Sequence, residues 1–386
     1  MRVLHILNHV REIGNGIVNV AVDLACLQAK NGHEVAVASG GGEYEQLLAS
    51  YGVKHLQLNQ TRKPVNLILA TARYRQIIKQ FQPDIVHTHM MTGIVLAKVL
   101  KANSHYNLVS TVHNEFQHSA ILMGLADRVI AVSKAVSESM AKRGIPQHKL
   151  RVISNGTLGS VRSSNIQEYE PVELQHPAIV TVAGMYQRKG VSELIDAFAQ
   201  IAADFPEAHL YIVGNGPDRQ SFAEQAQSTP CNRRIHFEGF QPQPQRYLLA
   251  ADIFVLASHR DPSPLVIPEA REAGCAIIAS DVDGIPEALD HGAAGILFPA
   301  KNSQALADAL ANLLQNPDLL SQWQDQAQQN LQRLTVGRVN QETLAVYAEL
   351  MPQDLFIETA ETYRTQRVYK CASPNKTIEP VNSSIT

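Results

Sequence analysis

The 386-residue chain has few cysteines, no long apolar run and no excess of charge of one sign. Its cysteines include no CxxC pair, so neither a disulfide framework nor a zinc site is expected. No stretch approaches the roughly 20 apolar residues of a membrane-spanning helix, and the N-terminal MRVLHILNHV lacks a signal-peptide core. The formal charge of −3 offers no basic field to a polynucleotide. We therefore expect a cytoplasmic protein with reduced thiols, no metal and no nucleic-acid partner. The cysteines are Cys26, Cys231, Cys275 and Cys371.

Apolar residues are abundant and are arranged in alternating patterns. They make up 45% of the chain, against 18% charged residues, as in soluble globular proteins. In the first unit, Val3 to Asn8 predicts a buried strand, Gly14-Asn15-Gly16 a turn, and the apolar spacing from Ile17 to Leu27 a helix. Such alternation is typical of a parallel sheet with helices on both faces. Further strands are predicted at 34–38, 53–58, 84–88, 108–112, 128–132 and 150–153.

The alternation stops once and then restarts. Residues 157–176 are rich in Ser and Glu and contain Pro171, which indicates an interdomain linker. Beyond it the pattern predicts strands at 178–183, 209–213, 235–237, 253–257 and 276–279, then helices at 303–315, 319–334 and one ending near Met351.

The length and the restart together predict two domains. We predict an α/β fold with two tandem Rossmann-like domains, 1–160 and 161–335. A helix and polar tail, 336–386, should pack back toward the first domain. In such a fold, ligands bind at the carboxyl edges of the sheets, so we expect the functional site in the cleft between the domains.

Glycine-containing turns follow four of the predicted strands. A turn without side chains lets backbone N–H groups and a helix N-terminus approach a phosphate closely. Any one of these turns is explained as well by the needs of a strand-to-helix corner, but four of them in both halves favour a diphosphate ligand. They are Gly14-Asn15-Gly16, Asn155-Gly156, Gly184 and Gly214-Asn215-Gly216-Pro217.

Two further segments carry charges at predicted helix starts. Arg188 and Lys189 precede a helix beginning near Val191, where cations oppose the helix dipole unless an anion is bound; the alternative is a solvated basic loop. Glu269 lies in the first turn of another helix, and Asp261 lies in the loop before it. Both carboxylates could accept from sugar hydroxyls. The alternative is a surface Asp and a Glu favoured by the dipole.

These segments, with Gly284-Ile285-Pro286-Glu287, resemble the retaining glycosyltransferases of the GT-B fold, glycosyltransferase family 4, from Met1 to about Met351. The resemblance implies that the donor lies mainly on the second domain and the acceptor on the first. It also implies that Glu269 contacts the donor ribose. Asp261, one methylene shorter than the usual glutamate, would then contact the transferred sugar.

The resemblance implies further residues around the diphosphate and the sugar. Lys189 matches the family lysine, whereas Met185 occupies the place of the family arginine, so Arg188 is expected to supply the second cation. His113 resembles the histidine near the donor sugar, while His87 and His89 are expected to be structural. The implied donor-binding set contains Gly14, Gly16, Gly214, Gly216, Phe240, Pro264, Leu265, Val266 and Glu269. Pro264 stands where glycine is usual and removes one N–H.

Two other features have competing interpretations. Asp281-Val282-Asp283 reads as a metal-binding DxD motif, but the resembling family has a loop of its second domain there, and we expect no metal. The basic, amphipathic segment 62–81 could lie on an anionic membrane at its cytoplasmic face, near a lipid-linked acceptor. A solvated helix over the sheet is the simpler interpretation of this segment.

The resulting hypothesis is a retaining, metal-independent transfer of a hexosyl unit from a nucleotide-diphosphate sugar, without a cofactor. The acceptor is expected to be a glycan, a lipid-linked or a small molecule, in cell-surface polysaccharide or glycolipid biosynthesis. A nucleotide-sugar epimerase or hydrolase on the same fold and a non-catalytic sugar-binding protein remain alternatives. A nicotinamide-dependent dehydrogenase is disfavoured, because Gly14-Asn15-Gly16 lacks the third glycine of GxGxxG.

Overall fold

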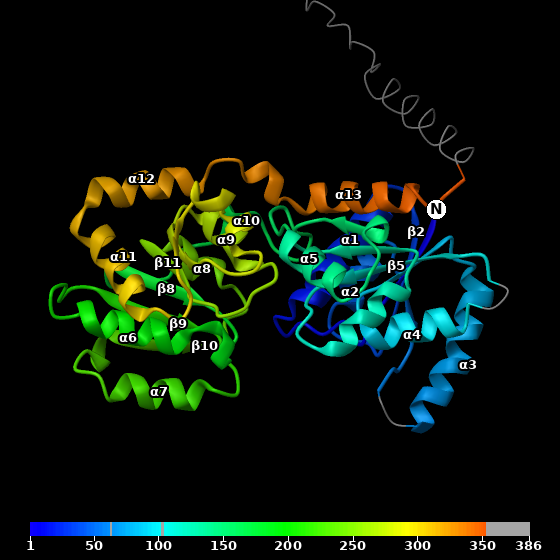
Figure 1. The fold of residues 1–386 in the computed structure, drawn as a ribbon, viewed down its shortest axis with the longest axis horizontal. Helices are drawn as coiled ribbons and strands as arrows, with labels where there is room; N and C mark the ends of the chain where they lie inside the picture. The colour runs from blue at the N-terminus through cyan, green and yellow to red at the C-terminus, as the bar shows by residue number, and fades with distance from the viewer. Residues whose placement is uncertain (62–63, 102–103, 353–386) are drawn as a thin grey trace, which may run out of the picture.

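The computed structural model describes residues 1–61, 64–101 and 104–352. These residues form two α/β domains, each built on one parallel sheet (Figure 1). The predicted GT-B arrangement of two tandem Rossmann-like domains is therefore confirmed. Residues 353–386, which include most of the predicted polar tail and Cys371, lie outside the described part of the chain.

The first sheet has seven strands in the order β3-β2-β1-β4-β5-β6-β7, and all of its pairs are parallel. Its inner strands read as continuous apolar runs because helices cover both faces. The strands are β1 Arg2–Ile6, β2 Glu34–Ser39, β3 Lys54–Gln57, β4 Ile85–Thr88, β5 Asn107–Val112, β6 Arg128–Ala131 and β7 Leu150–Val152. The accompanying helices are α1 Gly16–Lys30, α2 Glu45–Ser50, α3 Pro64–Phe81, α4 Met91–Val99 and α5 Lys134–Lys142.

The second sheet has six parallel strands in the order β10-β9-β8-β11-β12-β13. They are β8 Ala178–Val182, β9 His209–Val213, β10 Ile235–Gly239, β11 Ile253–Leu256, β12 Ala276–Ser280 and β13 Ile296–Phe298. The sequence pattern did not predict β13, because three apolar residues after Gly295 are too short a run to separate from a loop. The helices are α6 Val191–Ile201, α7 Arg219–Gln227, α8 Gln245–Leu249, α9 Val266–Ala273, α10 Ile285–Ala288, α11 Ser303–Gln315, α12 Pro317–Ala327 and α13 Val336–Ala348.

One predicted helix was too long. The apolar spacing predicted a continuous helix from Leu319 to Leu334, but α12 ends at Ala327. Asn330 adopts a left-handed conformation with φ of 56° and starts a separate 3-10 turn, Leu331–Leu334. Asparagine tolerates this conformation better than most residues, so the break is local in origin.

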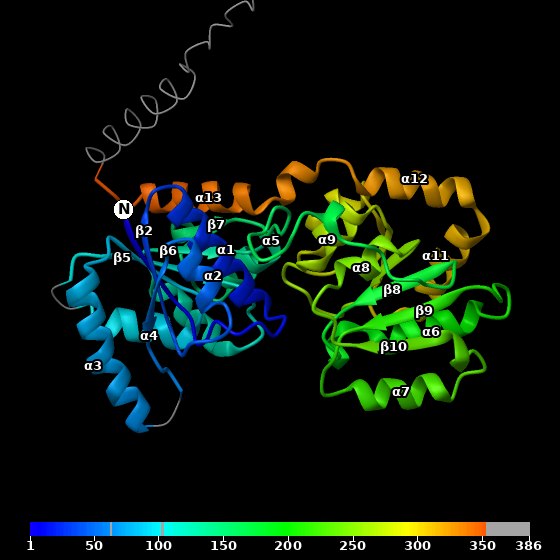
Figure 2. The same cartoon turned by 180° about the vertical axis from the view of Figure 1, so that it is seen from behind.

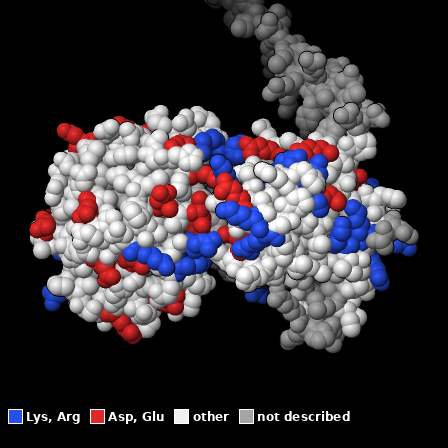
Figure 3. Space-filling model, viewed as in Figure 1, with Lys and Arg blue, Asp and Glu red and all other residues white. Residues whose placement is uncertain are grey.

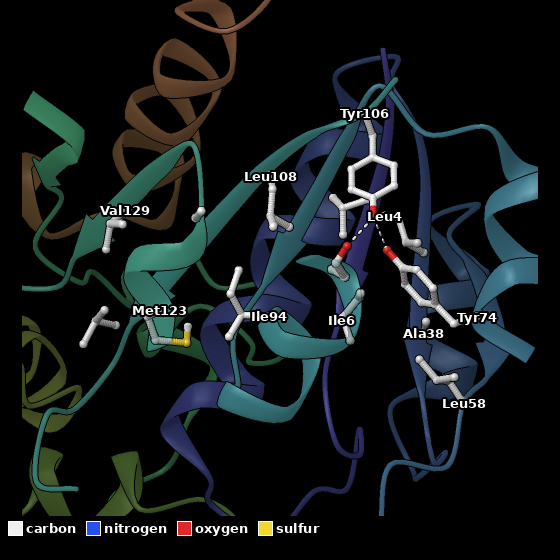
Figure 4. Packing of buried hydrophobic residues seen from close by; sticks show 14 of the residues in the cluster. Leu4, Ile6, Ala38, Leu58, Tyr74, Ile94, Tyr106, Leu108, Met123 and Val129 are labelled. Atoms are coloured by element: carbon white, nitrogen blue, oxygen red, sulfur yellow. Dashed lines mark hydrogen bonds between the residues drawn. The ribbon is translucent and has the colours of Figure 1, made fainter. Parts of the chain in front are cut away.

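Each sheet is buried between helices that contribute one apolar face. In α6, for example, Leu194, Ile195 and Phe198 are buried against the second sheet. In the first domain, buried side chains from β1, β4, β5 and α3 form one continuous cluster (Figure 4). Each fully buried Leu, Ile or Phe contributes about 1.5–3 kcal/mol of transfer free energy. The main clusters of the two domains share no residue, although Leu265 of the second domain packs against a cluster of the first.

The chain passes between the domains twice, and the two passages lie side by side. The Leu158 N–H donates to the Leu334 carbonyl at 3.1 Å, and the Val336 N–H donates to the Leu158 carbonyl at 3.0 Å. After the second passage, α13 runs back over the first domain (Figure 2). There Tyr347 and Val346 are buried with Val3 of β1.

Helix α3 exposes two large apolar side chains. Ile68 is 71% and Leu69 61% exposed, whereas Tyr74 and Ile77 are buried in the core. Arg62 and Lys63, which belong to the predicted basic segment, lie outside the described residues. Within the described ranges, no helix has the length and apolarity to cross a bilayer. Contact of segment 62–81 with a membrane surface stays a prediction.

Both sheets reverse their strand order at one point, and this determines which loops meet. The reversal lies between β1 and β4 in the first sheet and between β8 and β11 in the second. The loops after two such strands diverge to opposite faces of the sheet and leave a crevice at its carboxyl edge. The segments after β8 and β11 contain Lys189 and Asp261, while those after β1 and β4 contain Gly14 and His89.

Candidate functional site

Lys189 and Asp261 form an ion pair at the crevice of the second sheet. The Lys189 Nζ lies 2.6 Å from Asp261 Oδ2, and the two side chains are only 16% and 9% exposed. The Ser258 hydroxyl donates to the same oxygen at 3.4 Å. Within the described residues, no hydrogen bond involves Asp261 Oδ1, so the pair keeps one carboxylate oxygen for a ligand.

The loop that carries Lys189 is held close to β11 by a glycine. Gly190 has a φ of 68°, and a Cβ at this position would lie 1.8 Å from the Ala257 carbonyl oxygen. Only glycine permits both this conformation and this approach. Lys189 is thus placed beside the end of β11, where Asp261 follows.

Arg188 lies on the exposed side of the same loop. Its guanidinium is 5.5 Å from the ring centroid of Phe116, a residue of the first domain, and 5.7 Å from that of Tyr186. Met185, by contrast, is fully buried in the second core. Arg188 therefore lies at the domain boundary, as Arg260 does, whereas residue 185 lies in the core; the role of Arg188 as the second cation stays a prediction.

Glu269 occupies the first turn of α9 and is partly exposed. Among the described residues, none donates a hydrogen bond to its carboxylate. Burial raises the pKa of Glu269 to about 7, although the positive charge of Arg162 opposes the shift. A partly desolvated carboxylate without a partner is unfavourable, so this position is suited to a ligand that donates hydrogen bonds.

Asp283 shapes the loop around Asp261. Its carboxylate accepts from Arg260 Nε at 2.9 Å and from the backbone N–H of Asp261 at 2.9 Å. Asp283 itself has a φ of 48°. These bonds give Asp283, the second Asp of Asp281-Val282-Asp283, a role in holding the loop. The expectation of a metal-free site stays a prediction.

The glycine loop of the first domain lies against residues of the second that the sequence predicts to bind the donor. A Cβ on Gly16 would be 3.1 Å from Leu265 Cδ1, and one on Gly14 would be 3.8 Å from Phe240 Cε2. The Thr157 hydroxyl also donates to the Leu265 carbonyl at 3.3 Å. The structure therefore brings Gly14, Gly16, Phe240 and Leu265 together, and Val266 follows directly as the first residue of α9.

Other predicted donor residues have clear packing roles. A Cβ on Gly214 would lie 2.0 Å from the Ala183 carbonyl, and one on Gly216 would lie 2.4 Å from the Met185 carbonyl. Glycine is thus required there by close backbone packing alone. Pro264 is buried and lines an interdomain cavity of about 280 Å³ together with Glu287.

His113 follows β5 and is partly exposed. Its Nε2 lies 3.1 Å from His89 Nδ1, and burial lowers the pKa of His113 to about 3. Within the described residues, it makes no hydrogen bond to Lys189, Asp261 or Glu269. The structure therefore does not join His113 directly to the segments that carry Lys189, Asp261 and Glu269.

Sequence reasoning missed the residues that connect the two loops. Glu115, two positions after His113, pairs with Arg260 at 2.5 Å, and Arg260 precedes Asp261. Arg162 of the linker pairs with the buried Asp23 of α1 at 3.0 Å. The only signal for these pairs is a charged residue at a loop or an apolar helix face. Charged side chains of both signs gather along the boundary between the domains (Figure 3).

Comparison with known proteins is consistent with this geometry. Residues 164–330 match the family model of glycosyl transferases group 1, and residues 14–157 match that of glycosyltransferase family 4. The chain belongs to glycosyltransferase family 4. It is thus an enzyme of the glycosyltransferase class, as the sequence resemblance predicted.

Curated relatives are distant but match over most of their length. A phosphatidyl-myo-inositol mannosyltransferase of Mycolicibacterium smegmatis is 23% identical over 90% of this chain and 93% of its own. An N-acetyl-alpha-D-glucosaminyl L-malate synthase of Bacillus anthracis is 22% identical over 79% and 86%. The crystal structure of HepE from Anabaena in complex with UDP-glucose is 20% identical, with a TM-score of 0.76 over 90% of this family 4 chain and 100% of that one.

Proposed function

We propose that this glycosyltransferase transfers a hexosyl unit from a nucleotide-diphosphate sugar with retention of anomeric configuration and without a metal ion. The acceptor is a glycan, a lipid-linked molecule or a small molecule, and the reaction serves cell-surface polysaccharide or glycolipid synthesis. The observation that carries the proposal is the partly buried carboxylate of Glu269, which accepts no hydrogen bond within the described part of the chain and belongs to the same domain as the cations Lys189 and Arg188. HepE, which shares this fold, binds UDP-glucose.

Each donor-side group has a proposed role that follows from its surroundings. Glu269 accepts from the ribose hydroxyls. Lys189 turns from Asp261 Oδ2 toward the diphosphate, or contacts both. Asp261 accepts a hydroxyl of the transferred sugar through Oδ1. The backbone N–H groups of Leu265 and Val266, at the start of α9, donate to the diphosphate. Its negative charge is also stabilised by the positive N-terminal end of the helix dipole.

Stabilisation of the leaving diphosphate is the main catalytic contribution in this proposal. Once the donor is bound, Arg188, Lys189 and the backbone N–H groups face the diphosphate, so they need little further reorganisation as charge develops. The departing phosphate oxygen takes the acceptor proton. Closure of the first domain over the sugar excludes water that would hydrolyse the donor.

Glu269→Gln is the sharpest test, with Glu272→Gln as its matched control. Glu272 lies three residues further along α9, and burial also raises its pKa. Loss of a charge-assisted hydrogen bond of roughly 1.5–3 kcal/mol should weaken nucleotide-sugar binding about tenfold to 150-fold in Glu269→Gln, with little change in Glu272→Gln. Calorimetry with UDP, GDP and their hexose conjugates measures both variants.

Three outcomes would contradict the proposal. Equal affinities for the two variants would remove Glu269 from the donor site. Release of free hexose or its epimer from donor alone, at the rate seen with acceptor, would favour the hydrolase or epimerase alternative. Donor binding without turnover against a panel of acceptors would favour the non-catalytic alternative.

A further inference from the structure

Four histidines of the first domain form a continuous hydrogen-bonded chain that ends at the cleft. His113 Nε2 lies 3.1 Å from His89 Nδ1, and His89 Nε2 lies 3.1 Å from His5 Nδ1. His5 and His89 are 0% and 3% exposed. His5 stands on β1 opposite His87 on β4, so the chain crosses the strand reversal of the first sheet.

The chain continues through α1 to the returning helix α13. His5 Nε2 lies 2.9 Å from Gln28 Oε1, and Gln28 Nε2 donates to the Tyr347 hydroxyl at 3.4 Å. The Tyr347 hydroxyl lies 2.5 Å from His87 Nδ1, and His87 Nε2 lies 2.7 Å from the Thr111 hydroxyl.

A metal ion is the other interpretation of this cluster. His5, His87 and His89 each offer a ring nitrogen within 4.8 Å of the others. However, every ring nitrogen of these three residues already has a hydrogen-bond partner. A metal would have to break bonds that neutral histidines satisfy completely, so a proton-ordered chain explains the cluster better.

One end of the chain determines the hydrogen positions throughout. Gln28 Oε1 can only accept, so His5 Nε2 must carry the hydrogen. A neutral His5 then accepts on Nδ1, which requires a hydrogen on His89 Nε2. By the same step, a neutral His89 requires a hydrogen on His113 Nε2. Burial keeps the rings neutral, since it lowers the pKa of His5 to about 4 and that of His89 well below its usual value.

We propose that this chain fixes His113 as the Nε2–H tautomer, so that Nδ1 acts as an acceptor for a hydroxyl of the transferred sugar. Among the described residues, none is hydrogen-bonded to His113 Nδ1. His89, His5, Gln28 and Tyr347 are then positioning residues that act through His113. The inference rests on the proposed function only for the identity of the hydroxyl-bearing ligand.

The tautomer is measured directly by ¹⁵N-histidine NMR on the full-length protein without ligand. Tyr347→Phe removes the acceptor of Gln28 and frees its amide to reverse, so His113 should show both tautomers. Tyr74→Phe is the matched control: Tyr74 is also buried in the first domain, and its hydroxyl donates to Tyr106, outside the chain (Figure 4). Wild type and Tyr74→Phe should both show only Nε2–H. His89→Leu, which cuts the chain beside His113, should lose the preference for this tautomer.

Binding of donor analogues tests the acceptor role. If a sugar hydroxyl donates to His113 Nδ1, the analogue with fluorine in place of that hydroxyl should bind about two- to tenfold more weakly, because fluorine cannot donate a hydrogen bond. The analogue with hydrogen at that position should lose a similar amount of affinity. Tyr347→Phe should reduce this discrimination, and Tyr74→Phe should not.

The outcomes separate this inference from the proposed function. An Nδ1–H tautomer in wild type, or the same spectrum for Tyr347→Phe and Tyr74→Phe, would overturn the ordered chain. Equal binding of every fluorinated analogue and its parent would overturn the hydroxyl contact while leaving the transferase proposal intact. If no nucleotide sugar binds, the proposed function fails, and the spectra alone decide the chain.

Discussion

The two sides of the cleft present different polar groups: the second domain presents charged side chains, and the first presents neutral, hydrogen-bonded histidines. On the second domain, the loops after β8 and β11 carry a buried ion pair, Lys189–Asp261, and α9 carries Glu269, whose carboxylate accepts no hydrogen bond from any described residue. On the first domain, the segments after β4 and β5 carry His89 and His113, whose low pKa values keep them neutral. Charge is therefore concentrated where a diphosphate is proposed to bind, and neutral hydrogen-bonding groups where the sugar is proposed to lie.

Burying polar groups costs free energy in both domains, and each domain offsets this cost with different contacts. A buried charge requires a partner. In the second domain Lys189 and Asp261 are partners of each other, and both are also proposed ligand contacts. A neutral chain needs only complete hydrogen bonding, and the first domain supplies it through β1, α1 and α13. The charged side should therefore respond strongly to single substitutions and to pH, and the neutral side weakly.

The largest effect is expected from breaking the charged side at Lys189. Lys189→Met removes a cation from the proposed leaving group and leaves Asp261 buried without its partner. Transfer should fall about 100-fold to 1,000-fold, and folding stability by about 3–5 kcal/mol. Kinetic assays and urea unfolding measure the two effects. The double variant Lys189→Met with Asp261→Asn should regain much of the stability but none of the activity; recovery of transfer would contradict a catalytic role for Lys189.

The next largest effect is a dependence of donor affinity on pH, caused by the titration of Glu269. Because its pKa is about 7, donor affinity should rise with pH by up to about tenfold per unit below pH 7 and level off above it. Glu269→Gln should bind weakly with no such slope, as calorimetry between pH 6 and 8 would show. A wild-type slope retained in Glu269→Gln would assign the titration to another group.

The same shift predicts a change in stability of defined sign. Between the ordinary value of 4.5 and about 7, the folded protein binds more protons at Glu269 than the unfolded chain does. The stability that protonation provides is therefore present below pH 4.5 and lost as pH rises through 7. Glu269→Gln should flatten this part of the stability curve, as urea unfolding between pH 4 and 8 would show, because glutamine does not titrate.

The smallest effect is expected where the two sides touch. Glu115 pairs with Arg260, whose side chain is 48% exposed, so solvent screens the pair. Glu115→Gln should change the free energy of domain contact by about 0.5–1 kcal/mol and raise the KM for the donor only slightly. Glu34→Gln, which alters an exposed pair with Arg2 inside the first domain, is the control. A larger loss than in Lys189→Met would contradict the ranking of the two sides.

Sequence patterns were sufficient for every strand of the two sheets except β13, because alternation of strands and helices is a local signal. They also indicated Lys189, Asp261 and Glu269 as candidate site residues, because segments that follow the strands at the reversal border one crevice; their roles stay predictions. They did not reveal why His5, His87 and His89 are buried together, because that depends on the pairing of β1 with β4 and on the return of α13. The packing roles of Gly214 and Gly216 likewise depend on backbone contacts that no motif records.

The paired passages between the domains define how the cleft can open. Gly156 has no room for a side chain, since a Cβ there would lie 2.4 Å from the Leu334 carbonyl oxygen. The two strands of the connection are thus clasped at one edge of the molecule and act as a pivot. If the domains rotate about this pivot, the displacement is smallest beside the connection and largest on the opposite side of the cleft. Residues near Gly156 and Leu334 should therefore keep their spacing when the domains move.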